Sequence, residues 1–151
     1  MLCDSAAVIY YIVYRLAKGR LAVPSESPHF ADFLYWMSFT PSLQGTIAMK
    51  LAGDPNAATQ ERQMYYRSAC ERIDRYMNHL NLQLGKWPYL AGPEFTAADV
   101  YIMFSLTTMT RIGGPQIDGL PNVVEYVDRI SKRPAYIKAM AMVGPDAKRP
   151  Q

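Results

Sequence analysis

Apolar side chains recur in steps of three and four residues along most of the chain, with polar side chains between them. Val8, Ile12 and Leu16 follow this spacing near the beginning, and Ile73 and Met77 follow it near the middle. Such a period is typical of an α-helix that buries one face, whereas a half-buried strand would alternate strictly. No stretch shows that alternation convincingly, so the sequence predicts an all-α fold.

Start and stop signals divide this pattern into about six helices. Capping residues, prolines and glycines mark the ends. The predicted helices span residues 4–18, 28–51, 56–84, 96–112, 120–130 and 135–142. Pro41 lies inside the second of them and is expected to kink or end it, because proline removes a backbone donor and clashes with the preceding turn. The expected architecture is a helical bundle.

The segment 96–112 is expected to be the centre of this bundle. Thr96 and Asp99 have the spacing of a capping box, in which each side chain accepts the backbone N–H of the other residue. We therefore predict a structural role for both. From Val100 to Thr110 the helix carries no charged side chain. A helix that is apolar nearly all round belongs inside a protein, surrounded by other helices.

Composition and charge narrow the class of protein. A chain of 151 residues is long enough for one domain with a sizeable core. The net charge of +3 is small and the basic residues are scattered, which argues against a nucleic-acid partner. No apolar stretch has the length and composition of a membrane span, and Asp4 stands where a signal peptide would carry a basic residue. We expect a cytoplasmic protein with no membrane partner.

The cysteines and histidines offer no metal site by their spacing. Cys3 and Cys70 are too few for a disulfide framework and are expected to be reduced thiols. His29 and His79 do not have the spacing of metal ligands, either to each other or to the cysteines. Cys3 has no cation or base beside it in the sequence that would activate the thiol. We predict no metal.

Three stretches together resemble the cytosolic glutathione transferase family. Tyr89–Gly92 followed by Phe95–Val100 is similar to the helix-start signature of the family's C-terminal domain. Gly119–Val123 with Arg133–Tyr136 is similar to the closing helices of that domain, and Asp4–Val8 is similar to the end of the glutathione-binding domain. In this order and at these spacings, the resemblance covers nearly the whole chain.

The resemblance implies two parts joined by a linker. Residues 1–20 resemble the last helix of a thioredoxin-like glutathione-binding domain, residues 21–27 a linker, and residues 28–151 the C-terminal helical domain. The part of the family's first domain that carries the Tyr, Ser or Cys beside the glutathione sulfur has no counterpart here. We therefore expect no catalytic residue in this chain and no activity of the chain alone. A natural truncation, an incomplete gene sequence and a fragment are all open.

The activity that the resemblance implies is attack of the glutathione thiolate on a small hydrophobic electrophile, with glutathione as co-substrate. Asp4 and Ser5 would then hold the γ-glutamyl end of glutathione. Asp4 would pair with the ammonium group, and the Ser5 hydroxyl would donate to the carboxylate. By themselves these two residues are better explained as caps of the helix that follows. For this chain both interpretations stay open.

Tyr35, Trp36 and Phe39 lie on the helix that faces the electrophile pocket in the family. Trp36 and Phe39 are three residues apart and share a helix face, so the three are predicted to form an apolar wall for the electrophile. Ordinary core packing is the alternative. The family usually forms homodimers, which we expect here too. A non-catalytic helical module for protein interaction is the competing function, because transferase-like helical domains also serve as docking units in translation factors and synthetase complexes.

Overall fold

The computed structural model describes residues 3–143. Its α-helices are α1 (Ser5–Tyr10), α2 (Phe30–Ala52), α3 (Gln60–Leu84), α4 (Ala97–Thr107), α5 (Pro121–Ser131) and α6 (Pro134–Val143). A π-helical segment, η1 (Tyr11–Leu16), continues α1, and a 3₁₀ turn, η2 (Met109–Ile112), follows α4. The described residues thus contain six α-helices and no strand, which confirms the predicted all-α helical bundle.

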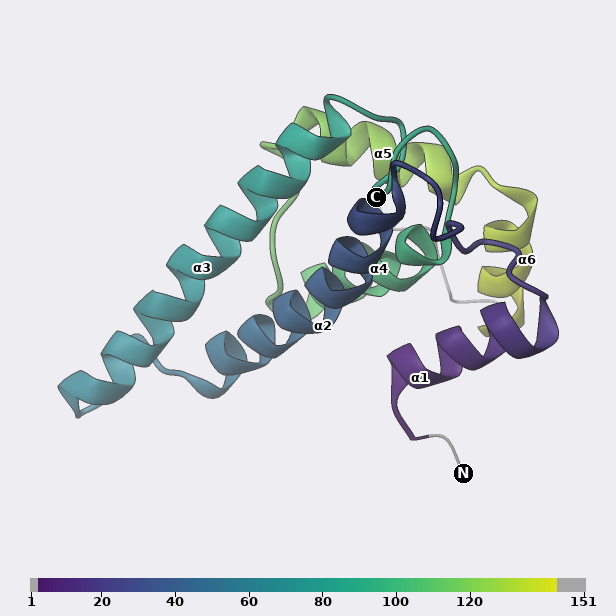
Figure 1. The fold of residues 1–151 in the computed structure, drawn as a ribbon. Coiled ribbons are helices and arrows are strands. Elements are labelled where there is room, and N and C mark those ends of the chain that lie inside the picture. The colour runs from purple at the N-terminus through teal and green to yellow at the C-terminus, as the bar shows by residue number, and fades with distance from the viewer. Residues whose placement is uncertain (1–2, 144–151) are drawn as a thin grey trace.

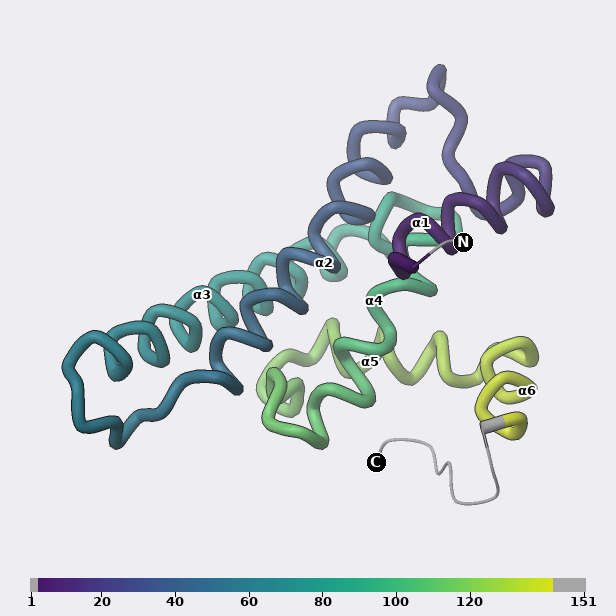
Figure 2. Tube along the Cα trace, turned by 90° about the horizontal axis from the view of Figure 1, so that it is seen from below, coloured from purple at the N-terminus to yellow at the C-terminus, as the bar shows by residue number. Residues whose placement is uncertain are grey.

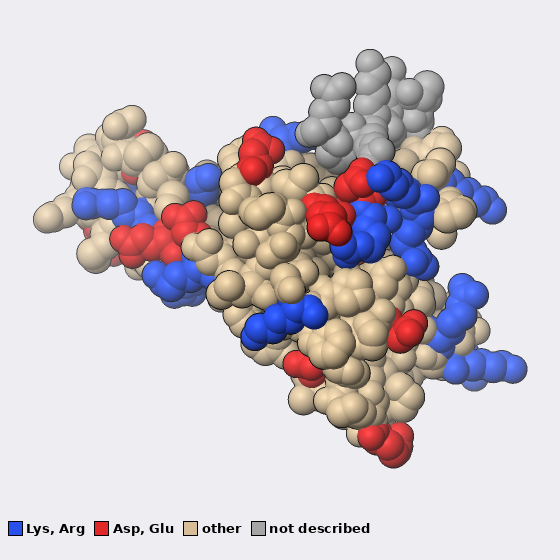
Figure 3. Space-filling model, turned by 90° about the horizontal axis from the view of Figure 1, so that it is seen from above, with Lys and Arg blue, Asp and Glu red and all other residues tan. Residues whose placement is uncertain are grey.

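The two longest helices form an antiparallel hairpin that extends to one side of the molecule (Figure 1). In both views α2 and α3 lie side by side (Figures 1 and 2). α4 packs against α2, and α5 packs against both α3 and α4. On the face drawn in Figure 3, acidic and basic side chains are interspersed among broad uncharged areas. This mixture agrees with the small net charge of the sequence.

One hydrophobic core joins the helices, and α4 supplies much of it. Ile102 of α4 is fully buried together with Leu43 of α2 and Val123 of α5. We predicted that other helices surround α4 on all sides, and this prediction is wrong for one edge of the helix. Val100 is 48% exposed and Phe104 is 52% exposed. These two residues are four apart, so one apolar edge of the central helix faces solvent.

Pro41 does not end the second helix, which continues without interruption to Ala52. Pro41 itself is exposed, so its ring lies on the outer side of α2. Met37 and Leu43, on either side of it, are both buried in the same core. Packing along both halves of α2 offsets the backbone hydrogen bond that proline cannot make.

Two helices begin later than predicted because short polar side chains hold turns in front of them. The Ser27 hydroxyl accepts the N–H of His29 at 3.2 Å, so Ser27 precedes a turn and α2 begins at Phe30. The Asp54 carboxylate accepts the N–H of the residue two further on at 2.8 Å, and α3 begins only at Gln60. Such local side-chain bonds compete with helical hydrogen bonds.

The predicted first helix is not a regular α-helix throughout. Its second half, Tyr11–Leu16, is π-helical. After this segment the backbone has positive φ angles at Lys18 (52°), Gly19 (82°) and Leu21 (72°). Residues other than glycine usually avoid this region of φ. The Leu21 carbonyl then accepts the N–H of Ala97 at 2.8 Å. The linker is therefore tied directly to the first turn of α4.

Candidate functional site

Asp4 and Ser5 lie at the exposed start of α1. Asp4 is the N-cap, and its Oδ1 accepts the N–H of Ala7 at 2.9 Å. Its second oxygen, Oδ2, makes no hydrogen bond with another described residue. Ser5 is exposed as well. The structure thus shows the capping role that the sequence favoured, and it leaves one carboxylate oxygen and one hydroxyl facing solvent.

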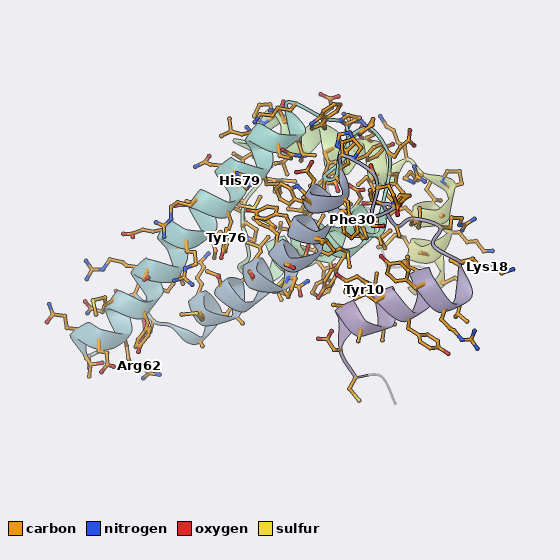
Figure 4. The ribbon with its side chains drawn as sticks, viewed as in Figure 1. Tyr10, Lys18, Phe30, Arg62, Tyr76 and His79 are labelled. Atoms are coloured by element: carbon orange, nitrogen blue, oxygen red, sulfur yellow. The ribbon has the colours of Figure 1, made fainter. Side chains whose placement is uncertain are left out.

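Two tyrosines that the sequence analysis did not connect with Asp4 lie in the same neighbourhood. Burial raises the pKa of Tyr101, and the negative charge of Asp4 and the phenol of Tyr10 raise it further. Tyr101 belongs to the first turns of α4 and is 7% exposed, whereas Tyr10 ends α1 (Figure 4). The uncharged stretch from Val100 to Thr110 predicted that Tyr101 lies in the core, and only the packing of α1 on α4 brings it near the carboxylate.

The segment formed by α1 and η1 is apolar on two sides. One side carries Val13, which is buried, and Ile9 and Tyr10, which pack against the core. The other side exposes Ile12 (48%) and Leu16 (64%) to solvent. The sequence predicted a single apolar face, because the inner and outer apolar residues fall on the same side of an ideal α-helical wheel. A π-helical stretch turns by a different angle per residue, and it separates them into two sides.

Tyr35, Trp36 and Phe39 come together with two side chains of α3. Trp36 and Phe39 are almost wholly buried, at 1% and 4% exposure, whereas Tyr35 is 48% exposed. The His79 ring stacks on Trp36 with 5.4 Å between centroids, and the Tyr76 ring meets Phe39 edge to face at 5.1 Å. Figure 4 shows Tyr76 and His79 on the side of α3 that faces α2.

These five rings form an aromatic cluster in the seam between α2 and α3. Of the three residues predicted to form the wall, only Tyr35 exposes a large part of its aromatic ring. The contribution of α3 could not be predicted from the sequence, because His79 and Tyr76 are about forty residues away from these aromatic residues along the chain. A role for Tyr35, Trp36 and Phe39 in binding an electrophile stays a prediction.

Asp99 is fully buried and accepts four hydrogen bonds. Its Oδ2 accepts the Thr96 N–H at 2.7 Å and the Thr96 hydroxyl at 3.0 Å. Its Oδ1 accepts the Leu90 N–H at 2.9 Å and the Tyr126 hydroxyl at 2.8 Å. The capping box itself is present. The carboxylate therefore joins the start of α4 to the preceding loop and to α5.

Burial raises the pKa of the Asp99 carboxyl, and the hydrogen bonds that it accepts oppose this rise. The phenol of Tyr126 is also buried, and burial together with the neighbouring Asp99 raises its pKa far above the ordinary value. The raised pKa of Tyr126 keeps its phenol neutral, so that the hydroxyl can donate to Asp99. Nothing in this arrangement is open to a ligand, so its geometry is that of a structural connection.

The cysteines and candidate metal ligands add no second centre. Cys3 is exposed and Cys70 is half-buried, and both are free thiols. Within residues 3–143, no three side chains of His, Cys, Asp or Glu gather closely enough to hold a metal ion. In the same part of the chain, no helix has the length and apolar character needed to cross a bilayer.

The glutathione S-transferase C-terminal domain model matches residues 28–134, which include α2 to α5. The chain belongs to the glutathione S-transferase family. Two transferases of Arabidopsis thaliana are similar in sequence. Glutathione S-transferase F14 is 24% identical over 133 residues, which cover 82% of this chain and 52% of that protein. Glutathione S-transferase F13 is 28% identical over 150 residues, which cover 91% of this chain and 66% of that protein.

Solved transferase structures share the fold. A glutathione S-transferase from Actinobacillus pleuropneumoniae superposes with a TM-score of 0.81 at 19% identity, over 97% of this chain and 66% of that one. A sphingomonad glutathione S-transferase complexed with glutathione superposes with a TM-score of 0.70 at 23% identity, over 95% and 69%. The chain spans about half to two thirds of the length of these two Arabidopsis relatives.

Proposed function

We propose that this chain takes part in conjugating glutathione to small hydrophobic electrophiles, together with a thioredoxin-like segment of the kind its family carries. The match of the family model over residues 28–134 carries this proposal. In the reaction the glutathione thiolate attacks an electrophilic carbon, a carbon–sulfur bond forms, and the electrophile's leaving group departs or its carbanion takes up a proton. The group that stabilises the thiolate lies outside this chain, so the chain alone is inactive.

Asp4 and Ser5 hold the γ-glutamyl end of glutathione in this proposal. The free Oδ2 of Asp4 pairs with the ammonium group, while Oδ1 keeps the helix cap. The exposed hydroxyl of Ser5 donates to the α-carboxylate. Tyr101, whose pKa is raised partly by Asp4, stays neutral beside this pair and adds no competing charge.

The electrophile lies against Tyr35 in this proposal, with Trp36 and Phe39 supporting that ring from behind. The 48% exposure of Tyr35 and its edge-to-face contact with Trp36 at 5.1 Å support this division of roles. We also place the protein in the cytoplasm and propose a homodimer, which light scattering would detect as a doubled mass. A monomer at micromolar concentration would contradict the dimer.

Calorimetric titration of glutathione into the chain tests the central contacts. We expect saturable binding in the millimolar range, because only part of the family's site is present. The variant Asp4→Asn should weaken binding at least about tenfold, since asparagine keeps the N-cap but removes the charge. Ser5→Ala should weaken it several-fold. The matched control is Asp118→Asn, an exposed carboxylate outside the candidate site.

The outcomes separate the two classes of function. Binding that Asp4→Asn abolishes and Asp118→Asn leaves intact supports the glutathione contacts. Binding that ignores both changes overturns the role of Asp4 and Ser5. No binding at millimolar glutathione overturns the proposal that Asp4 and Ser5 hold glutathione in this chain, and it favours the non-catalytic interaction module.

A further inference from the structure

The free end of the hairpin formed by α2 and α3 carries a small hollow, which we call the tip hollow. This end projects away from the other helices on one side of the molecule (Figures 1 and 2), and Arg62 lies there (Figure 4). The tip hollow has a volume of about 270 Å³ and is lined by Met49, Ala52, Gly53, Arg62 and Tyr65. A partner can therefore approach it without meeting the rest of the molecule.

Contacts within the turn between α2 and α3 form the tip hollow in advance. Ala57 is 6% exposed, and its carbonyl accepts the side-chain amide of Gln63 at 2.9 Å. The N–H of Gly53 donates to the Met49 carbonyl at 3.0 Å. A Cβ at Gly53 would lie 3.0 Å from the Cβ of Tyr66, so this glycine lets α3 approach the end of α2 closely. A surface that is already formed lowers the entropic cost of binding a partner.

Large apolar side chains at the tip hollow are left uncovered. Met49 is 42% exposed and Tyr65 is 54% exposed, although both line the hollow. Met64, next to Tyr65 in the sequence, is 64% exposed. Tyrosine, methionine and arginine are the residue types enriched in protein–protein interfaces, and methionine adapts its shape to different partners. This composition is typical of a surface that binds another protein.

Arg62 supplies the charge of the tip hollow. Among the described residues that line it, Arg62 is the only charged one, and its side chain is exposed. The neighbouring carboxylate, Glu61, lines a different hollow on α3. Arg62 forms no ion pair with another described side chain. Its guanidinium group has five donors in a planar fork, which matches the two oxygens of a carboxylate.

We propose that the tip hollow binds a segment of another protein in which an aromatic residue is next to an acidic residue. The aromatic ring enters the hollow between Met49 and Tyr65, and the carboxylate pairs with Arg62. A volume of about 270 Å³ accommodates one ring but lies below the range of roughly 300–1,000 Å³ that is usual for drug-sized ligands. This inference does not rest on the proposed conjugation.

A second copy of this chain does not supply such a segment. In the sequence an acidic residue is next to an aromatic one at Asp32–Phe33, Glu94–Phe95 and Glu125–Tyr126. Phe33 and Tyr126 are fully buried. Phe95 is half-buried, and the guanidinium carbon of Arg133 lies 3.7 Å from the centre of its ring. The occupant is therefore expected on a different protein.

Titration of the ¹⁵N-labelled protein with a peptide, followed by NMR, tests the proposal. The probe is the hexapeptide Ser-Gly-Glu-Phe-Gly-Ser with blocked ends, and the amide signals of Ala52 and Gly53 report on the tip hollow. Two matched peptides replace its Glu by Gln or its Phe by Ala. We expect saturable shifts with a Kd of about 1 mM for the probe, and binding at least about fivefold weaker for either matched peptide.

Variants of the protein separate the charge from the apolar surface. Arg62→Gln should remove the preference for the Glu peptide over the Gln peptide, whereas Arg62→Lys should keep part of it. Arg67→Gln changes an exposed arginine of the same helix outside the tip hollow, so this matched control should keep the full preference. Tyr65→Ala removes one wall and should weaken binding of the probe at least about threefold. Circular dichroism checks that each variant is folded.

Four results would overturn the proposal. Equal binding of the Glu and Gln peptides to the unaltered protein would show that Arg62 does not select a carboxylate. Loss of the preference in Arg67→Gln as well as in Arg62→Gln would show a general effect of charge. Signal changes confined to residues outside the tip hollow would place the binding elsewhere. Unchanged signals at about 10 mM probe would show that the hollow does not bind this motif. If Tyr65→Ala then lowered the mass measured by light scattering, a second copy would be the occupant. None of these readouts involves glutathione, so they leave the proposed conjugation untouched.

Discussion

The start of α4 and the start of α1 each use an aspartate to satisfy backbone N–H groups, yet the surroundings of the two aspartates differ. Asp99 is fully buried and accepts four hydrogen bonds from three elements of the fold. Asp4 is exposed and accepts one, from its own first turn. Asp99 thus connects three elements of the fold, whereas one carboxylate oxygen of Asp4 remains exposed to solvent.

The two regions also treat apolar surface differently. Around Asp99 the neighbouring side chains Leu90, Ala98 and Tyr126 are fully buried. The segment of α1 and η1 leaves Ile12 and Leu16 about half or more exposed. The comparison teaches that an aspartate in a helix-capping motif accompanies a buried connection in one place and a partly uncovered surface in the other. Tertiary contacts decide between them.

The largest effect should come from Asp99→Ala. This change leaves the N–H groups of Leu90 and Thr96 and the hydroxyl of Tyr126 without their acceptor inside the protein. Each unpaired buried donor costs about 1–3 kcal/mol, so loss of the acceptor of three donors should lower the free energy of unfolding by at least about 3 kcal/mol. Urea denaturation followed by circular dichroism measures it. Asp118→Ala is the exposed control, and equal losses in both variants would contradict the role of Asp99.

The two sides of the N-terminal segment should respond differently. Val13→Ala removes two buried methyl groups from a side chain that is 4% exposed and should cost about 2 kcal/mol. Ile12→Ser alters a neighbouring side chain that is 48% exposed and should change stability by less than about 0.5 kcal/mol. Thermal unfolding of both variants measures the contrast. Equal losses would mean that the outer side is covered in solution.

Tyr126→Phe should have a smaller effect than loss of the carboxylate. The change removes the hydroxyl that donates to Asp99 at 2.8 Å and keeps the buried ring. A hydrogen bond to a charged group contributes about 1.5–3 kcal/mol, so the free energy of unfolding should fall by about 2 kcal/mol. Tyr14→Phe, on a ring that is 52% exposed, is the control and should be close to neutral.

Thr96→Ala should cost about 1 kcal/mol, the usual contribution of a threonine N-cap. The variant loses the hydroxyl of the capping box but keeps the backbone N–H that donates to Asp99. Thr108→Ala, on an exposed threonine just past the end of the same helix, is the matched control. A stability unchanged within error in the Thr96 variant would mean that the hydroxyl contributes nothing to the connection.

The smallest effect should be a dependence on pH. Because burial raises the folded-state pKa of Asp99 above its ordinary value of 3.8, the folded protein keeps a proton that the unfolded chain has lost. The stability contributed by this group therefore increases as the pH falls toward about 4 and is lost as the pH rises through the folded-state pKa. The difference in unfolding free energy between the unaltered protein and Asp99→Asn should grow from pH 7 to pH 4. A difference that shrinks would contradict the direction of the shift.

Much of the fold follows from local pattern. The helical period, the caps and the prolines located six helices, and the spacing of Thr96 and Asp99 identified a real capping box. Boundaries shifted where Ser27 and Asp54 form turns of their own. Of the two outcomes predicted for Pro41, a kink or an end, the end does not occur, because packing along the whole of α2 keeps the helix intact.

The candidate sites depend more on distant contacts. The sequence marked Asp4 and Ser5 through the family resemblance, but it gave no signal that Tyr101 lies near them. It marked Trp36 and Phe39, but their contacts with His79 and Tyr76 come from another helix. Met49 and Tyr65 line the tip hollow together only because α2 and α3 pack side by side.

By itself the sequence determined which segments are helical, where most of them begin and end, and which family the pattern resembles. Those properties depend on hydrogen bonds and side-chain spacing within a few residues, which a linear sequence displays. Only the tertiary structure decided which polar groups are paired and which apolar faces are covered. Leu90 and Tyr126 complete the bonds of Asp99 from different elements, and Val100, Phe104 and Ile12 stay exposed, because burial is a property of neighbours that the chain brings together only on folding.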